Sequence, residues 1–323
     1  MRRFDRRRLL SAAGLSLLFG SRLAAALDDE RGAGTAVLRA SGSDAAGSRS
    51  RVFTSRGYTD CRFGQLHFLR GAPATAKISK PTLVLLHQNP SSSVEYELLL
   101  EAMAADREVI AFDTPGNGMS DWPPAPQDMA GYAQAFADGL KNLSLGVSEP
   151  VDVFGYHTGT FLGAELAIAE PDRVGRLALS GVPFRTIEER EERLAKNATG
   201  PKLTEDGDEI LANMRNLWKF VVSQRDPRVP LDRAAKVFIE KAKPLDRYWW
   251  PYEGVWTYEV RERFPLISQP VLIVQPRENL LENSRRAAEF IQDAEFVELA
   301  ELNRDVFDVG VTAIAAELRR FFT

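Results

Sequence analysis

The sequence is poor in the residues that build disulfide, redox and metal sites. Of its 323 residues one is a cysteine, Cys61, and three are histidines, His67, His87 and His157. A single cysteine excludes an intrachain disulfide and a CxxC site, and three scattered histidines show no metal-ligand spacing. We therefore expect no metal ion in this protein.

The sequence also lacks a basic stripe, and its formal net charge is −4. The first 26 residues carry six Arg and one Asp, which leaves 35 Lys and Arg against 44 Asp and Glu, a net of −9. An acidic domain of this kind argues against nucleic acid as a partner.

An apolar run long enough to anchor the chain in a bilayer is missing as well. The run Leu9–Phe19 is too short for a stable anchor, and no later segment is apolar enough. It follows a basic stretch, precedes small residues at Ala24–Ala26, and Asp5–Leu10 resembles the twin-arginine motif. We expect residues 1–26 to be a twin-arginine signal peptide of a periplasmic or secreted bacterial protein, rather than an ordinary signal peptide or an amphipathic tail. Residues 27–50 have the composition of a flexible linker.

The remaining chain alternates short apolar runs with helical patterns, which is typical of a mostly parallel sheet covered by helices on both faces. An opening hairpin is expected over Val52–Tyr58 and Gln65–Leu69. The expected later strands are Thr82–Leu86, Glu108–Phe112, Val151–Phe154, Arg176–Leu179, Val271–Val274 and Glu295–Leu299. The expected helices include Val94–Ala105, Asp128–Leu143, Gly159–Ala169 and Val311–Phe322.

Between residues 183 and 265 the pattern is helical without strand candidates, and we interpret this stretch as a cap inserted into a core of residues 51–182 and 266–323. The charge run Glu188–Arg193 is expected to form a solvated helix face. The aromatic cluster Tyr248–Tyr252 fits either the cap's own core or the roof of an apolar pocket.

Three segments of the core, in this order and spacing, resemble the α/β-hydrolase superfamily. Leu85–Ser93 is similar to the His-Gly-x-Pro loop, and its Asn-Pro-x-Ser-Ser portion to haloalkane dehalogenases, of the branch that includes epoxide hydrolases. Ala111–Asp121 resembles the loop after the fourth strand, and Val153–Gly159 resembles the nucleophile elbow Gly-x-Ser-x-Gly. The resemblance implies an α/β-hydrolase fold and no organic cofactor. The spacing of Gly155, Gly159 and Gly163 does not fit a dinucleotide loop.

The sequence departs from that family's catalytic pattern. The elbow position holds His157, and all three histidines precede the last two strands, so an ordinary Ser-His-Asp triad is absent. The loop after Val274 places Asn279 nearest the usual aspartate, with Glu278 beside it, and the loop after Leu299 contains Asp305 but no histidine.

We therefore hypothesise that His157 acts as a general base, oriented by Glu278 or Asp305 on loops that converge at the elbow. The resemblance implies an oxyanion hole made by the Thr158 N–H and by Gln88 or Asn89, with the Asn89 amide as a further donor. It implies a supporting role for His87 and a structural role for Asp113. Trp122 is expected at the entrance of the pocket.

The first function hypothesis is an exported enzyme that acts on a small apolar carbonyl compound such as an ester or lactone. The alternative is a non-catalytic relative in which His157 fills a retired site and the cap covers a bound small molecule. A protein-interaction module has little support in the sequence. Turnover compared with a His157→Ala variant separates the first two.

Overall fold

The computed structural model describes residues 52–74, 78, 80–196 and 200–323. The expected signal peptide over 1–26 and the expected linker over 27–50 lie outside the described residues. Among the residues described, no helix is both long and apolar enough to cross a membrane.

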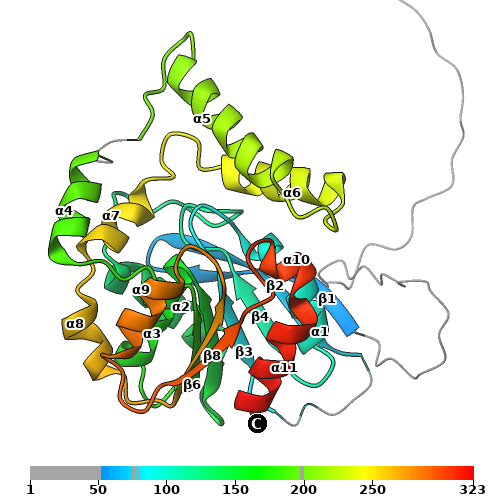
Figure 1. Cartoon of the computed structure of the whole chain (residues 1–323). Helices are drawn as coiled ribbons and strands as arrows, with labels where there is room; N and C mark the ends of the chain where they lie inside the picture. The colour runs from blue at the N-terminus through cyan, green and yellow to red at the C-terminus, as the bar shows by residue number, and fades with distance from the viewer. Residues whose placement is uncertain (1–51, 75–77, 79, 197–199) are drawn as a thin grey trace, which may run out of the picture. The chain divides into compact units, whose positions relative to one another are not determined.

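One sheet of eight strands, in the order β1-β2-β4-β3-β5-β6-β7-β8, forms the centre of the described chain (Figure 1). The hairpin strands β1 and β2 are antiparallel, and β2 is antiparallel to β4. The six strands β4-β3-β5-β6-β7-β8 are parallel to one another. The strands are β1 (Val52–Cys61), β2 (Gly64–Pro73), β3 (Leu83–Leu86), β4 (Val109–Phe112), β5 (Val151–Tyr156), β6 (Val174–Ser180), β7 (Val271–Pro276) and β8 (Glu295–Leu299). The predicted fold class is confirmed.

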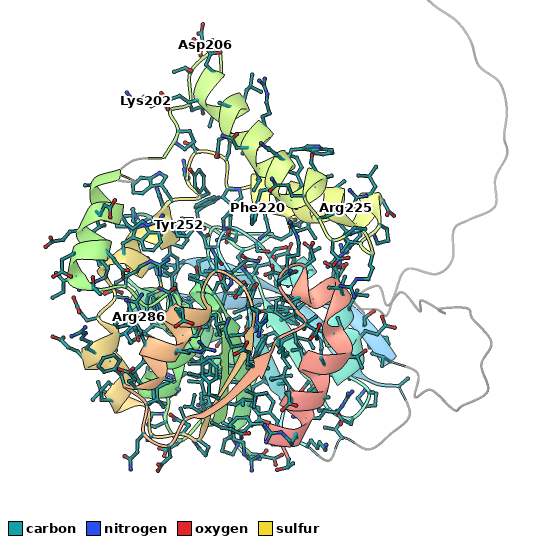
Figure 2. All side chains as sticks on the ribbon, viewed as in Figure 1. Lys202, Asp206, Phe220, Arg225, Tyr252 and Arg286 are labelled. Atoms are coloured by element: carbon teal, nitrogen blue, oxygen red, sulfur yellow. The ribbon has the colours of Figure 1, made fainter. Side chains whose placement is uncertain are left out.

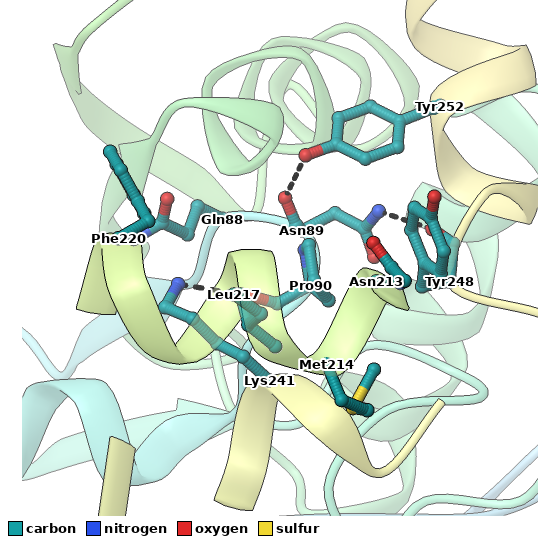
Figure 3. Close-up of a pocket in the computed structure, with 10 residues that line it drawn as sticks. All are labelled: Gln88, Asn89, Pro90, Asn213, Met214, Leu217, Phe220, Lys241, Tyr248 and Tyr252. Carbon is teal, nitrogen blue, oxygen red and sulfur yellow. Dashed lines mark hydrogen bonds between the residues drawn. The ribbon is translucent and has the colours of Figure 1, made fainter. Parts of the chain in front are cut away.

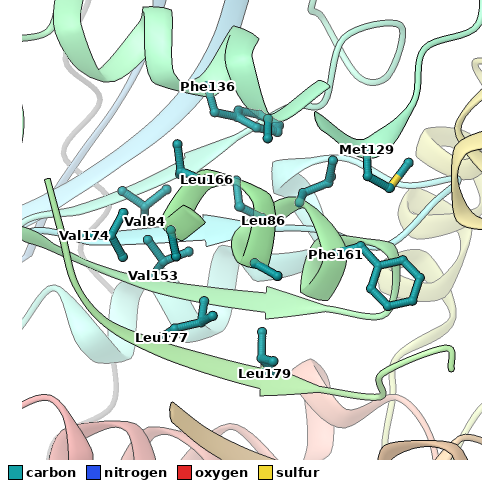
Figure 4. Packing of buried hydrophobic residues seen from close by; sticks show 14 of the residues in the cluster. Val84, Leu86, Met129, Phe136, Val153, Phe161, Leu166, Val174, Leu177 and Leu179 are labelled. Carbon is teal, nitrogen blue, oxygen red and sulfur yellow. The ribbon is translucent and has the colours of Figure 1, made fainter. Parts of the chain in front are cut away.

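Continuous apolar runs form the middle of this sheet because helices cover both of its faces. Every residue of β3 and β4 is buried. One face packs against α2 (Met129–Asn142), α3 (Thr158–Ala169) and α9 (Leu281–Ala288), in a cluster part of which is drawn in Figure 4. The other face packs against α1 (Glu97–Met103), α10 (Val306–Val309) and α11 (Val311–Phe321).

The segment between β6 and β7 is helical and contains no strand among its described residues. It consists of helices and helical turns, most of which stand beyond the carboxyl ends of the central strands (Figure 1). They are α4 (Ile187–Lys196), α5 (Asp208–Trp218), a π-helical turn (Lys219–Ser223), α6 (Leu231–Ala242), α7 (Trp250–Thr257), α8 (Val260–Arg263) and a 3-10 turn (Phe264–Leu266). We call residues 183–265 the cap.

The charge run of α4 is mostly exposed, but Glu189 is partly buried and one arginine is buried. Glu188, Glu191 and Glu192 are exposed as expected, but Arg190 is buried. Its guanidinium pairs with Glu259 and donates to the carbonyl oxygens of Thr257 and Tyr258. Arg190 therefore joins two parts of the cap rather than facing water.

The expected helix Val94–Ala105 is only partly α-helical. Its first turn is a 3-10 helix, Ser93–Tyr96, before α1 begins. Ser92 caps this turn by accepting a hydrogen bond from the Val94 N–H at 3.3 Å. The turn is tied to the sheet because the Ser93 N–H donates to Asp113 at 2.6 Å, in the loop after β4.

Candidate active site

His157 occupies a sharp turn between β5 and α3, with φ 49° and ψ −115°. A positive φ is uncommon for a residue with a side chain, and strain of this kind concentrates at functional sites. The turn requires glycine on both sides. A Cβ on Gly155 would lie 2.1 Å from the Gly159 carbonyl oxygen, and one on Gly159 would lie 2.0 Å from the Leu86 carbonyl oxygen. The close approach of β5, α3 and β3 therefore explains the glycine spacing.

Glu278, which follows β7, is the carboxylate that meets His157. The distance from His157 Nε2 to Glu278 Oε1 is 2.8 Å, and the two side chains are 21% and 8% exposed. The Tyr156 hydroxyl donates to the other oxygen of Glu278 at 3.1 Å. Burial raises the pKa of Tyr156 well above its ordinary value, so this hydroxyl stays a donor.

This pairing determines which ring nitrogen of His157 is available. A carboxylate accepts the Nε2–H of the neutral imidazole, so the lone pair lies on Nδ1. Nδ1 has no hydrogen-bond partner among the residues that the structure describes. It is therefore the nitrogen that can accept a proton.

Asp305, the other candidate partner of His157, has different contacts. Its Oδ2 accepts the Asp226 N–H at 2.7 Å and pairs with the Arg304 guanidinium at 3.1 Å. Asp305 begins α10 and joins that helix to the cap. Of the two carboxylates proposed from the sequence, only Glu278 reaches the imidazole.

Gly181, directly after β6, leaves room for the His157–Glu278 pair. A Cβ at this position would lie 2.3 Å from His157 Cδ2 and 2.5 Å from Glu278 Oε1. Its φ of 69° also disfavours any other residue. Gly181 could not be predicted as a site residue, because nothing in its local sequence pattern places it against the elbow.

His157 lines a cavity of about 340 Å³ between the core and the cap. A cavity of this size lies within the range of small-molecule sites. From the core come Gln88, Asn89, His157, Thr158, Asn279 and Leu280, and from the cap Pro183, Arg185, Arg193, Tyr248, Trp249, Tyr252, Val255 and Trp256. The aromatic cluster of the cap thus contributes Tyr248, Trp249 and Tyr252 to the cavity, in agreement with the roof interpretation.

Thr158 is the first residue of α3, and it lines the same cavity. The N–H groups of the first helical turn have no partner within the helix and carry the positive end of its dipole. The Thr158 N–H, next to the imidazole in the chain, is therefore suited to stabilising negative charge that develops beside His157.

The loop Gln88–Pro90 lies beside the cavity, and hydrogen bonds attach it to the cap. The Asn89 amide donates to the Tyr248 carbonyl oxygen at 2.7 Å, and the Tyr252 hydroxyl donates to the Asn89 carbonyl oxygen at 2.6 Å (Figure 3). The Gln88 amide donates to Glu95. One N–H of the Asn89 amide therefore holds the cap, which leaves the second N–H as the remaining donor of this side chain.

A second cavity of about 230 Å³ adjoins the first and is drawn in Figure 3. The two cavities share Gln88, Asn89, Tyr248 and Tyr252. Lys241 lines the second cavity, and its ammonium group donates to the Pro90 carbonyl oxygen at 3.0 Å and lies 3.8 Å from Glu95. The charge of Lys241 is thus compensated.

Trp122 does not line either cavity. Its ring packs edge-on against Trp250, 5.6 Å between centroids, and Arg247 lies 5.3 Å above it. The expected position at the entrance is therefore replaced by a packing role between the core loop and the cap. Asp113 has the structural role expected, since it binds His67 at 2.8 Å and the Ser93 and Met119 N–H groups.

Both ring nitrogens of His87 bond to backbone groups. Its Nε2 accepts the Thr114 N–H at 2.9 Å, so its Nδ1–H donates to the Gln88 carbonyl oxygen at 2.6 Å. Burial lowers its pKa below the ordinary value of 6.5. Protonation of Nε2 would place an N–H against the Thr114 N–H and break this hydrogen bond.

The buried neutral state of His87 predicts a pH dependence of stability. Below about pH 6.5 the unfolded chain binds the proton and the folded chain does not, so the free energy of unfolding falls as the pH falls. The slope from this group approaches about 1.4 kcal/mol per pH unit. We expect His87→Gln, which keeps an acceptor, to flatten the curve between pH 7.5 and 5.5 in urea titrations. Equal slopes for the two proteins would contradict the assignment.

Residues 81–302, more than half of the chain, match the family described as alpha/beta hydrolase fold. The chain is 30% identical over 134 residues to a haloalkane dehalogenase of Mycolicibacterium paratuberculosis, covering 41% of this chain and 42% of that protein. It is 28% identical over 174 residues to a poly(3-hydroxyalkanoate) depolymerase of Ectopseudomonas oleovorans, covering 49% and 54%. These matches span about half the length of the curated relatives. The structure of an enol-lactonase from Burkholderia xenovorans superimposes with a TM-score of 0.67 at 20% identity, covering 82% of this chain and 99% of that one.

Proposed function

The chain belongs to the α/β-hydrolase fold family, and from this premise we propose that it is an enzyme that hydrolyses a small carbonyl compound, such as an ester or lactone, with His157 as general base. The single observation that carries the proposal is the 2.8 Å contact between His157 Nε2 and Glu278 Oε1 at the wall of a cavity. A histidine held by a carboxylate with its second nitrogen free is the usual arrangement of a general base.

The proposed reaction uses water as the nucleophile. Nδ1 of His157 takes a proton from water, the water oxygen bonds to the carbonyl carbon, and negative charge develops on the carbonyl oxygen. The Thr158 N–H stabilises this oxyanion. The tetrahedral intermediate then breaks the bond to the leaving oxygen, which receives the proton from the imidazolium. The products are a carboxylic acid and an alcohol from an ester, or a single hydroxy acid from a lactone, and His157 returns to its neutral state.

The proposal is tested with a panel of esters and lactones on the wild-type protein and on His157→Ala. We expect measurable hydrolysis by the wild type and a loss of about 10²–10⁴-fold in kcat for the variant. Activity that the substitution leaves unchanged would remove His157 from the mechanism.

The second candidate function is a non-catalytic small-molecule binding protein. It is favoured by one observation, the use of the Asn89 amide to hold the Tyr248 carbonyl oxygen, which leaves fewer donors for an oxyanion. Saturable binding of panel compounds without turnover by the wild type would favour this function.

We also propose that the protein is exported through the twin-arginine route, to the periplasm or beyond. Support comes from the sequence, where Arg6 and Arg7 precede Arg8, Leu9 and Leu10. We expect the double substitution of Arg6 and Arg7 by lysine to leave the protein in the cytoplasmic fraction. Unchanged fractionation would contradict this route.

A further inference from the structure

Two arginines and no acidic residue are among the described residues that line the cavity at His157. The arginines are Arg185 and Arg193. Glu278 lies behind the imidazole with its side chain 8% exposed, and its two oxygens bind His157 and Tyr156. A ligand in the cavity therefore meets the Arg185 guanidinium rather than a carboxylate.

Arg185 is the more informative of the two arginines because its contacts are fully described. Its Nη1 donates to the Phe184 carbonyl oxygen at 3.1 Å, and it forms no ion pair in the part of the chain that the structure describes. Burial lowers its pKa, and Arg193 and Arg286 lower it further against the opposing effect of Glu189. Glu189 is used elsewhere, since it accepts the Thr186 N–H at 2.8 Å and pairs with Arg286 at 3.5 Å.

Lys241 in the adjoining cavity differs from Arg185, because a carboxylate lies close to its charged group. Lys241 has Glu95 at 3.8 Å and the Pro90 carbonyl oxygen at 3.0 Å. The guanidinium of Arg185 donates to one backbone carbonyl oxygen, and Glu189 acts on it without forming an ion pair. A half-buried cation that lacks a carboxylate is stabilised when an anionic ligand supplies one.

The walls between Arg185 and His157 are suited to the apolar middle part of a ligand that has a polar group at each end. Tyr248, Trp249, Tyr252 and Trp256 supply aromatic surface, and Arg193 lies 5.8 Å above the Trp256 ring. Aromatic rings of this kind contact apolar groups of a ligand. The Tyr252 hydroxyl is bonded to the Asn89 carbonyl oxygen, whereas the buried Trp256 Nε1–H has no hydrogen-bond partner in the part of the chain that the structure describes.

From this arrangement we infer that the ligand of the cavity is an anionic carbonyl compound, whose carboxylate pairs with Arg185 while its carbonyl group lies against His157 and Thr158. The placement of the carbonyl group rests on the proposed function, and the recognition of the carboxylate rests on the cavity alone. Guanidinium binds carboxylate through two parallel hydrogen bonds, which makes arginine selective for this group. The substrate class is thus narrowed to esters or lactones that also carry a carboxylate.

The test measures binding by titration calorimetry with two probes of similar shape, phenylacetate and phenylacetamide. Four proteins are compared: the wild type, Arg185→Gln, Arg261→Gln and His157→Ala. Arg261→Gln is the matched control, since Arg261 packs over the Phe184 ring, does not line the cavity and leaves the pair of Glu189 with Arg286 intact; Figure 2 marks Arg286 and the cavity residue Tyr252.

We expect phenylacetate to bind the wild type about 10–100-fold more tightly than phenylacetamide, the range of a hydrogen-bonded charged pair. Arg185→Gln is expected to remove this preference, whereas Arg261→Gln and His157→Ala keep it. Equal binding of the two probes, no binding of either, or a preference that survives Arg185→Gln would overturn the inference. Selective binding together with an inactive wild type would instead reject the proposed function and leave the inference standing.

Discussion

Substitution of Glu278 by glutamine is expected to lower kcat on the best ester or lactone substrate by roughly 10²–10⁴-fold. Glutamine can turn its NH₂ group toward Nε2, which then becomes an acceptor and moves the proton to Nδ1. The imidazole would then present an N–H to the substrate instead of a lone pair. The loss should fall in kcat rather than in KM, because the proton is transferred only in the reaction itself.

The matched comparison for this prediction is Asp305→Asn. The Asp305 carboxylate accepts the Asp226 N–H and pairs with Arg304, so we expect its substitution to change kcat by less than about threefold. Circular dichroism and the free energy of unfolding should be close to wild type for Glu278→Gln, since the glutamine oxygen still accepts from Tyr156. A larger loss from Asp305→Asn than from Glu278→Gln would reverse the assignment.

The second large effect concerns Gly159, and it is an effect on stability. Alanine here would place a Cβ 2.0 Å from the Leu86 carbonyl oxygen and 3.1 Å from that of His87. Both neighbours are backbone atoms, at the end of a buried strand and in the loop that follows, so relief requires α3 to move away from the sheet. We expect the free energy of unfolding to fall by about 3 kcal/mol or more.

Gly163→Ala is the control, because it makes the same chemical change on the same helix. Its Cβ would meet the Leu177 side chain at 3.1 Å instead of a backbone carbonyl. Alanine also favours the helix by up to about 1 kcal/mol, which offsets the closer contact. Urea titrations should therefore place Gly163→Ala within about 1 kcal/mol of the wild type. If Gly159→Ala were equally stable, the close approach at the elbow would not exist.

Much of the core could be predicted from local patterns. The runs Leu83–Leu86 and Val109–Phe112 are continuously apolar because both of their faces are covered, and this signal needs no knowledge of distant residues. The spacing of Gly155 and Gly159 around His157 has a local cause in the turn itself. The first turn after β3 is a 3-10 turn rather than the expected α-helix. The hydrogen bond from the Ser93 N–H to Asp113, a residue distant in the sequence, ties this turn to the sheet.

The site was only partly accessible from the sequence. Asn89 was proposed as an oxyanion donor, but its amide holds a carbonyl oxygen of the cap 159 residues away. Trp122 was proposed for the entrance, but its ring packs against Trp250. Both outcomes depend on where the cap rests on the core, and no local pattern encodes that. Tyr156, directly before His157, is a sequence signal for this site, since its hydroxyl reaches the Glu278 carboxylate that binds the imidazole.

The sequence alone excludes an ordinary Ser-His-Asp triad, because all three histidines precede the last two strands. It also locates the strained turn, because Gly155 and Gly159 flank His157 at the spacing of the elbow. Only the tertiary structure decided that Glu278 rather than Asp305 meets His157, and that Arg185 faces the same cavity. The physical reason is that these side chains follow different strands and come together at the carboxyl ends of a parallel sheet. There, a displacement of one residue in a loop changes which group lies within hydrogen-bond distance.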